Sequence, residues 1–270
     1  MPHQWKDHVI IITGASAGIG KALALALAPQ SHKLVLVARD RAQLEEVAEA
    51  CERVGATTLV VPTDVTDSCA CEAMVHAAID KFSKIDVLVN NAGMSMWATV
   101  EDVQEVSRFQ NLMDVNFMGS VYCTKFALPF LKQTQGRIVA ISSVASFTGV
   151  PFHAIYSASK HAMNGFFESL RIEMAGTGVS VTIVAPDFVQ SEIHARSLGA
   201  DGKPAGRLLQ DHASFLSAET CAAIIIKAMI HRKRLVITSL RGKLGRWVKL
   251  CVPQVIDWIA KRGVAKAYRL

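Results

Sequence analysis

The chain has 270 residues, of which 51% are hydrophobic, and its formal net charge is +6. This length and composition exclude a disordered chain and allow one large α/β domain or two small ones. The charge is uneven: from residue 231 to the end, eleven Lys and Arg residues accompany one acidic residue, Asp257, while the rest holds 18 basic and 22 acidic residues. The body is therefore mildly acidic, and the positive excess lies in the C-terminal tail.

The cysteines and histidines give no sign of a metal site. Six cysteines occur without metal-ligand spacing, and His153, His194 and His212 are equally scattered. The N-terminus carries early charges and no apolar segment of the kind found in secretory signals. We therefore expect no bound metal and a reducing, cytoplasmic location.

The first predicted unit is a strand, a glycine turn and a helix. A β-branched run, Val9 to Ile12, is followed by glycines at Gly14, Gly18 and Gly20 and by a helix over Lys21 to Ala28. Glycines allow a backbone to approach a pyrophosphate closely, and a helix N-terminus offers free N–H groups and a positive dipole end. This order of elements predicts a dinucleotide-binding turn.

Alternating strands and helices follow. We expect strands at 33–38, 57–62, 85–89, 136–141, 179–184 and 234–237, separated by helices at 41–53, 69–82, 154–174 and 218–231 and by a long helix ending near Pro129. This alternation predicts a doubly wound α/β fold, with a parallel seven-stranded sheet and helices on both faces.

A hydroxyl, a phenol and an ammonium are expected at one place. Ser143 lies at the carboxyl end of the strand over 136–141, and Tyr156 and Lys160 lie four residues apart on one face of the next helix. A nearby lysine cation favours the phenolate and lowers the pKa of a tyrosine, which could then exchange a proton with a carbonyl or alcohol oxygen. The neighbouring Ser142 is interpreted as structural, although a shift of one residue would exchange the two serines.

The pattern Tyr156-x-x-x-Lys160 with Ser143 thirteen residues upstream resembles the active site of the short-chain dehydrogenase/reductase family. The glycine turn, Asp64-Val65, Asn90-Asn91-Ala92-Gly93 and Asn116 occur in that family's order, and the resemblance covers about residues 8 to 237. It implies catalysis by Ser143, Tyr156 and Lys160, with Asn116 bending its helix and holding a water that reaches Lys160. Coenzyme binding is implied for Gly14, Ser16, Gly18, Ile19, Gly20, Arg39, Asp64, Val65, Asn91, Ala92, Gly93, Tyr156, Lys160 and Ser191.

The end of the second strand indicates the coenzyme. NAD-specific relatives usually carry an acidic residue there, whereas this chain has Ala38 followed by Arg39, whose guanidinium could bind a 2′-phosphate. We predict NADP(H). A shift of one residue would instead make Asp40 a ribose ligand and favour NAD.

The loop after the sixth strand departs from the family pattern. Family members usually have Pro-Gly and then a threonine that binds the nicotinamide carboxamide; here Asp187 replaces the glycine and Ser191 the threonine. The following residues, to about 217, suit a mobile substrate lid. Apolar residues of this lid and of other loops suggest a pocket for a hydrophobic substrate, and core packing is the alternative for about half of them. They are Leu198, Leu208, Leu209 and Phe215 in the lid and Met94, Met96, Trp97, Val150 and Phe152 elsewhere.

The C-terminal tail has an apolar stripe that includes Trp247 and Trp258, with Arg and Lys beside it and a break at Pro253. Such a stripe resembles a helix that lies on anionic lipid, and it is too interrupted to span a bilayer. Packing on its own domain or on another subunit is an equal alternative. The tryptophans lie apart from the charges, which argues against nucleic-acid binding.

We therefore expect one NADP(H)-binding domain over residues 1–240, including a lid at about 187–217, and a basic extension over 241–270. The expected activity is hydride transfer between NADP(H) and a hydrophobic ketone or secondary alcohol such as a lipid or steroid. The alternative is a non-catalytic coenzyme-binding or membrane-docking protein of the same fold. The resemblance further implies a homodimer or homotetramer, and peripheral attachment to the inner face of a membrane is a second possible location.

Overall fold

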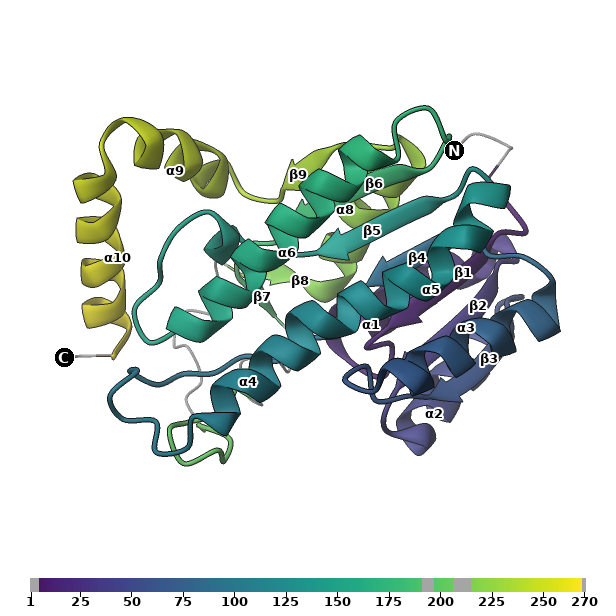
Figure 1. Ribbon diagram of the computed structural model, residues 1–270, viewed down its shortest axis with the longest axis horizontal. Coiled ribbons are helices and arrows are strands. Elements are labelled where there is room, and N and C mark those ends of the chain that lie inside the picture. Colours follow the sequence, from purple (N-terminus) through teal and green to yellow (C-terminus); the bar gives the residue numbers. More distant parts are fainter. Residues whose placement is uncertain (1–4, 191–196, 206–214, 269–270) are drawn as a thin grey trace.

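A single parallel sheet forms the centre of the molecule (Figure 1). The computed structural model describes residues 5–190, 197–205 and 215–268, with the backbone alone for 263–268. The strands lie in the order β3-β2-β1-β4-β5-β6-β9, and every neighbouring pair is parallel. They are β1 Val9–Thr13, β2 Lys33–Ala38, β3 Thr57–Pro62, β4 Val87–Asn90, β5 Arg137–Ile141, β6 Ser180–Ala185 and β9 Leu235–Ile237. The predicted seven-stranded parallel sheet is confirmed.

Helices cover both faces of this sheet. The helices are α1 Gly18–Leu27, α2 Arg41–Glu52, α3 Ser68–Phe82, α4 Ser107–Met113, α5 Gly119–Gln133, α6 Ala154–Glu173, α8 Ala218–Ile230, α9 Leu240–Cys251 and α10 Pro253–Tyr268. Shorter elements are the 3-10 turns η1 Ala28–Gln30 and η3 Val144–Ser146, the π-helical turn η2 Asp114–Met118, and a small parallel pair, β7 Val189–Gln190 with β8 Leu216–Ser217. Helices α1, α2 and α8 pack on one face, and α3, α5 and α6 on the other.

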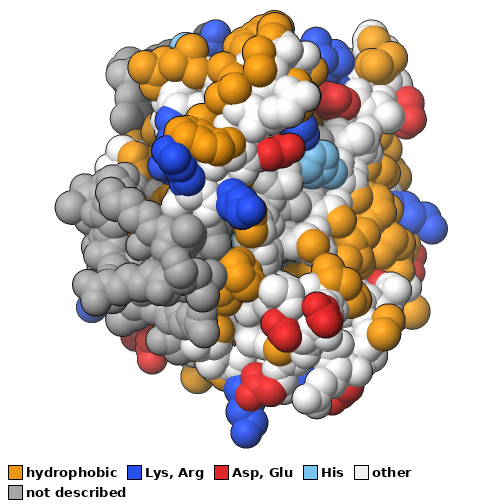
Figure 2. Space-filling view, turned by 90° about the vertical axis from the view of Figure 1, so that its left-hand side faces the viewer, with side chains coloured by type: hydrophobic (Ala, Val, Ile, Leu, Met, Phe, Trp, Pro, Cys, Tyr) orange, Lys and Arg blue, Asp and Glu red, His pale blue; other side chains and the backbone are white. Residues whose placement is uncertain are grey.

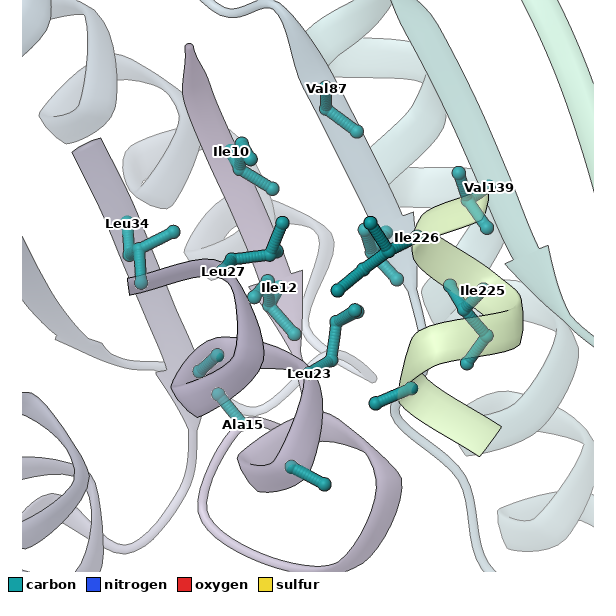
Figure 3. Packing of buried hydrophobic residues seen from close by; sticks show 14 of the residues in the cluster. Ile10, Ile12, Ala15, Leu23, Leu27, Leu34, Val87, Val139, Ile225 and Ile226 are labelled. Carbon is teal, nitrogen blue, oxygen red and sulfur yellow. The ribbon is translucent and has the colours of Figure 1, made fainter. Parts of the chain in front are cut away.

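The β-branched run of β1 explains why the sheet is buried on both sides. Ile10 and Ile12 point into the core beneath α1 and α8, where Leu23 and Ile225 also lie (Figure 3). The intervening Ile11 belongs to the opposite core, beneath α3, α5 and α6. Successive side chains of a strand point to opposite faces, so a strand covered on both faces needs an unbroken apolar sequence.

Two prolines in helical segments have different effects on their helices. The expected end of a helix near Pro129 is wrong, because α5 continues through Pro129 to Gln133. Cys123, Ala127 and Leu131, on either side of the proline, are buried in the core beneath α3, and this packing holds the helix across the missing N–H group. Pro253 acts as expected: it starts α10 after a break at Val252.

No helix within the described part of the chain is both long and apolar enough to cross a bilayer. The helices α9 and α10 instead project beyond the sheet at one end of the molecule (Figure 1).

Candidate active site

A cleft of about 740 Å³ lies at the carboxyl ends of the strands. Its walls come from the segments that follow β1, β2, β3, β4, β5 and β6. The strand order grows in one direction from β1 to β3 and in the other from β4 to β6, so the segments after β1 and β4 diverge. Open α/β sheets bind ligands at such a switch point.

The glycine turn after β1 forms one wall of the cleft. Gly14 and Gly18 have φ angles of 67° and 53°, in the left-handed region that favours glycine. A Cβ atom on Gly20 would collide with the carbonyl oxygen of Gly14. The turn therefore needs all three predicted glycines, and it keeps the backbone open to the cleft.

The start of α1 fits a bound pyrophosphate. Its N-cap, Ala17, supplies no side-chain hydrogen bond, and the first turn contains no acidic residue. In α2 and α3, by contrast, the carboxylates of Asp40 and Asp67 accept hydrogen bonds from the first-turn N–H groups. The first N–H groups of α1, at the edge of the cleft, are left for an anion.

Asn91 and Thr13 hold the turn against β4. The Asn91 Nδ2 donates to the carbonyl oxygens of Thr13 at 2.9 Å and Gly14 at 3.2 Å. The Thr13 hydroxyl accepts hydrogen bonds from the backbone N–H groups of Asn91 at 2.9 Å and Ala92 at 3.0 Å. Asn91, Ala92 and Gly93 all line the cleft, as expected, and Asn91 has the further task of fixing the turn.

Arg39 and Asp40, which follow β2, have different contacts. β2 ends at Ala38, and the Asp40 carboxylate accepts a hydrogen bond from the N–H of Gln43 at 3.1 Å as the N-cap of α2. Arg39 lines the cleft together with Asp64. Burial would raise the pKa of Asp64, but hydrogen bonds from Thr66 and the charge of Arg39 hold it below its ordinary value.

Ser143, Tyr156 and Lys160 come together at the other end of the cleft. Ser143 follows β5, while Tyr156 and Lys160 lie on the first turns of α6. The Ser143 hydroxyl and the Tyr156 phenol both line this end of the cleft, and Ser143 acts to lower the pKa of Tyr156. The Lys160 ammonium donates to the carbonyl oxygen of Ile141 at 2.9 Å and lies 5.9 Å from the centroid of the Tyr156 ring.

The neighbouring serine has a different role. The Ser142 hydroxyl donates to the Asn164 Oδ1 at 2.8 Å, and the Asn164 Nδ2 donates to the Ser146 hydroxyl at 2.8 Å. Ser142 therefore ties β5 to α6, and Ser143 is the serine that acts on the pKa of Tyr156. The choice between the two serines follows from these contacts.

Burial sets the protonation of the phenol and the ammonium. It raises the pKa of Tyr156, although Ser143 acts in the opposite direction. This is the reverse of the lowering that we expected from Lys160, because both groups are removed from water. Burial lowers the pKa of Lys160 from 10.5 to about 8.

Asn116 lies in the π-helical turn η2, so the expected distortion of this helix is present. Its Oδ1 accepts from the N–H of Met94 at 2.8 Å, and its Nδ2 donates to the Met94 carbonyl at 3.0 Å and the Ser159 hydroxyl at 3.0 Å. A Cβ on Gly93 would lie 3.2 Å from the Asn116 Oδ1 and 3.7 Å from the Lys160 Nζ. Asn116 therefore fixes the wall beside Lys160, and the water link stays a prediction.

Sequence reasoning missed His153, which lines the cleft, and Arg241, which lies outside it but contacts one of its lining residues. His153 lines the cleft near Tyr156, with ring centroids 5.7 Å apart, and its Nδ1 lies 2.6 Å from the Met96 carbonyl oxygen. Burial lowers the pKa of His153, so its ring is neutral. The second is Arg241, which binds Asp187 from the C-terminal extension. The sequence could have indicated His153 as a cleft residue, because it lies three residues before Tyr156. No sequence signal indicated a role for Arg241.

The expected apolar wall is partly present. Met94, Val150 and Leu198 line the cleft, whereas Met96 is buried in a separate core. Trp97 and Phe152 stack on each other with ring centroids 5.1 Å apart. Ser191, His194, Leu208, Leu209 and His212 lie outside the described residues, as does much of the expected lid. Within the described ranges, no group of three potential ligands could hold a metal ion.

Several known proteins are similar to this chain in sequence. The family described as short chain dehydrogenase matches residues 8–200. A protein of Sesamum indicum named 11-beta-hydroxysteroid dehydrogenase A is 36% identical over 93% of this chain and 74% of its own length. The 11-beta-hydroxysteroid dehydrogenase 1A of Arabidopsis thaliana is 38% identical over 93% of this chain and 73% of its own.

Two solved structures have the same fold. A short chain dehydrogenase/reductase from Burkholderia phymatum in complex with NAD has a TM-score of 0.83 and 25% identity, covering 93% of this chain and 96% of that one. An alcohol dehydrogenase from the archaeon Thermococcus sibiricus, complexed with 5-hydroxy-NADP, has a TM-score of 0.74 and 26% identity, covering 87% and 96%.

Proposed function

Because the chain belongs to the short-chain dehydrogenase/reductase family, we propose that it transfers hydride between NADP(H) and a hydrophobic ketone or secondary alcohol. The observation that carries this proposal is the meeting of Ser143, Tyr156 and Lys160 at one end of a cleft whose other end is the glycine turn. The bound coenzyme supplies a hydride from C4 of its nicotinamide ring, or accepts one there.

In the reductive direction the Tyr156 phenol gives its proton to the substrate oxygen. Its raised pKa keeps it protonated at neutral pH, which suits a proton donor. The Ser143 hydroxyl, which lines the cleft with Tyr156, donates its one proton to the same oxygen as negative charge develops there. The Lys160 ammonium then stabilises the phenolate that remains, and Asn116 keeps the adjoining wall in place. Oxidation of an alcohol reverses these transfers.

The residues after β2 support NADP(H). The Asp40 carboxylate is engaged in capping α2, while Arg39 lies free to bind a 2′-phosphate at the cleft. The two related structures hold an NAD and an NADP analogue, so they do not decide between the coenzymes.

A hydrophobic substrate is supported by Met94, Val150, Phe188 and Leu198, which line the cleft near Tyr156. Two relatives are named 11-beta-hydroxysteroid dehydrogenase, and these names support a steroid-like or lipid-like ketone as the substrate of this chain. The test is NADPH and NADH oxidation by the purified chain over a panel of apolar ketones, with small polar ketones as controls. Turnover with NADPH and an apolar ketone is expected. Binding of NADPH without turnover of any of them would favour a non-catalytic coenzyme-binding protein.

A peripheral membrane contact is proposed for α9 and α10. Trp247 and Leu250 are 67% and 70% exposed, and Trp258 is 53% exposed. Hydrophobic side chains gather near Lys and Arg side chains on the end of the molecule that carries these helices (Figure 2). Apolar and basic groups together favour an anionic lipid surface, and this supports the proposal that the protein lies on the inner face of a membrane.

Self-association into a homodimer or homotetramer is proposed through the outer sides of α5 and α6. These helices lie next to each other on one face of the sheet (Figure 1), and Ile172 near the end of α6 is 66% exposed. Light scattering of the chain in solution measures its mass directly.

A further inference from the structure

The loop after β6 carries an ion pair that joins it to the C-terminal extension. The Arg241 guanidinium donates two hydrogen bonds to the Asp187 carboxylate, from Nε at 2.9 Å and from Nη2 at 2.7 Å. The Ser239 hydroxyl donates to the same carboxylate at 2.6 Å. We call these three residues the C-terminal clasp.

The carboxylate in the clasp is shielded from water, with its side chain only 9% exposed. Burial alone would raise the pKa of Asp187, but the hydrogen bonds from Arg241 and Ser239 outweigh burial and lower it. Asp187 is therefore an anion, and its charge is balanced by Arg241. Phe188 extends the contact, because its ring lies 5.1 Å from the Arg241 guanidinium.

The same loop forms part of the cleft and touches the catalytic segment. Pro186, Asp187 and Phe188 line the cleft. The Pro186 carbonyl oxygen accepts a hydrogen bond from the N–H of Val144 at 3.0 Å, immediately after Ser143. A chain of direct contacts therefore runs from Arg241 through Asp187 and Pro186 to the residue beside Ser143.

Helix α9 contacts the catalytic segment a second time. The Lys249 ammonium donates to the carbonyl oxygen of Phe147 at 2.6 Å, and the Arg246 guanidinium lies 5.0 Å from the Phe147 ring. A Cβ on Gly242 would lie 2.8 Å from the Val144 Cγ1. The helix thus braces both segments that flank the reacting end of the cleft.

From these contacts we propose that Arg241 and Asp187 are positioning residues, and that α9 completes the nicotinamide end of the coenzyme site. Arg241 holds the loop in place and neutralises a carboxylate that would otherwise face an anionic coenzyme across the cleft. The domain boundary that we expected between residues 240 and 241 would therefore separate Arg241 from the loop that it holds. This inference rests on the proposed function, because it places the nicotinamide beside Ser143 and Tyr156.

The experiment compares NADPH dissociation constants, measured by coenzyme fluorescence, for four variants of the full chain. Arg241→Met leaves Asp187 unpaired, and we expect binding to weaken about tenfold. Asp187→Asn loosens the loop without leaving a carboxylate there, so a smaller loss is expected. The double variant Asp187→Asn/Arg241→Met should bind NADPH more tightly than Arg241→Met alone, because the repelling charge is absent.

Lys243→Met is the matched control, since it removes one positive charge from an exposed position on the same helix. Its affinity should equal that of the native chain. Equal affinities for Arg241→Met and Lys243→Met would overturn the proposal, and so would a double variant that binds as weakly as Arg241→Met. A simple loss of packing would not give this order of affinities. If Arg241→Met does not fold, Asp187→Asn carries the comparison with Lys243→Met, and equal affinities of these two would overturn the proposal.

The result also separates this inference from the proposed function. A native chain that binds no dinucleotide would refute the function, whereas native affinity in the Arg241 variant would refute the clasp alone. Thermal unfolding of the same variants without coenzyme still reports the coupling between Asp187 and Arg241 in either case.

Discussion

Lys160 carries its positive charge at a site where burial opposes it. Its pKa is lowered from 10.5 to about 8 in the folded chain. Between about pH 8 and 10.5 the unfolded chain binds this proton and the folded chain does not, so stability rises with pH. Below about pH 8 the folded chain bears the full penalty. Keeping this ammonium charged in the folded chain therefore lowers stability.

Replacing this ammonium should stabilise the inactive protein. We expect Lys160→Met to have the greater free energy of unfolding at neutral pH, by up to about 3 kcal/mol. Its advantage should shrink by about 2 kcal/mol as the pH approaches 10, because the native lysine then folds uncharged. Chemical denaturation of both proteins at both pH values measures the difference in their free energies of unfolding. The titration of all other groups is common to both proteins and cancels in this difference. An advantage that does not change with pH would contradict the buried charge.

Arg39 decides the coenzyme in this account. Arg39→Ala should raise the KM for NADPH by about 10- to 100-fold and leave the KM for NADH nearly unchanged, because only NADPH carries the 2′-phosphate. Arg41→Ala is the control, since Arg41 is exposed and pairs with Glu45 at 3.6 Å. Equal losses with both coenzymes would show that Arg39 does not bind the 2′-phosphate.

Residue types and spacing were enough to predict that these three side chains lie together, but not the direction of their pKa shifts. Ser143, Tyr156 and Lys160 were expected together, and the structure brings them to one end of the cleft. The raised pKa of Tyr156 follows from burial, which depends on side chains from several elements. Arg241 escaped prediction for a related reason: 54 residues separate it from Asp187 in the chain.

At the scale of elements, α9 has an inner side that braces the cleft and an outer side that is apolar. Leu244 and Trp247 are 56% and 67% exposed, although Lys249 of the same helix bonds to Phe147. Truncating the chain at this helix would remove both sides together. Point substitutions on the outer side test the membrane contact while they leave the inner contacts of α9 with the cleft in place.

The double variant Leu244→Glu/Trp247→Glu should lose co-sedimentation with phosphatidylserine vesicles, because it removes apolar area and adds negative charge. Its NADPH affinity should be unchanged, since the clasp is left intact. Val106→Glu is the control, as Val106 is 74% exposed and lies just before α4, outside the extension. Retained vesicle binding by the double variant would exclude this face as the membrane contact.

Local signals predicted most helices and strands, and they failed where packing outweighs them. Pro129 would end an isolated helix, but buried neighbours on both sides keep α5 continuous. At Pro253 the surrounding residues are exposed, and there the chain does break. The difference lies in the burial of the flanking turns, which the proline itself does not reveal.

At the scale of the whole molecule, the alternation of strands and helices was sufficient for the sheet. Right-handed crossovers between parallel strands reduce the number of arrangements, but the strand order, with its switch between β1 and β4, comes from the structure. The placement of α9 against the carboxyl ends of β5 and β6 did not follow, because an amphipathic helix at a chain end can pack on its own domain, on lipid or on another subunit.

The central claim is that Tyr156 exchanges a proton with the substrate beside a coenzyme bound over the glycine turn. Its most direct test is Tyr156→Phe, assayed for ketone-dependent NADPH oxidation and, in parallel, for NADPH binding by fluorescence. We predict that turnover falls by at least about 10³-fold while the NADPH dissociation constant changes by less than about threefold. Turnover close to that of the native chain would contradict the claim.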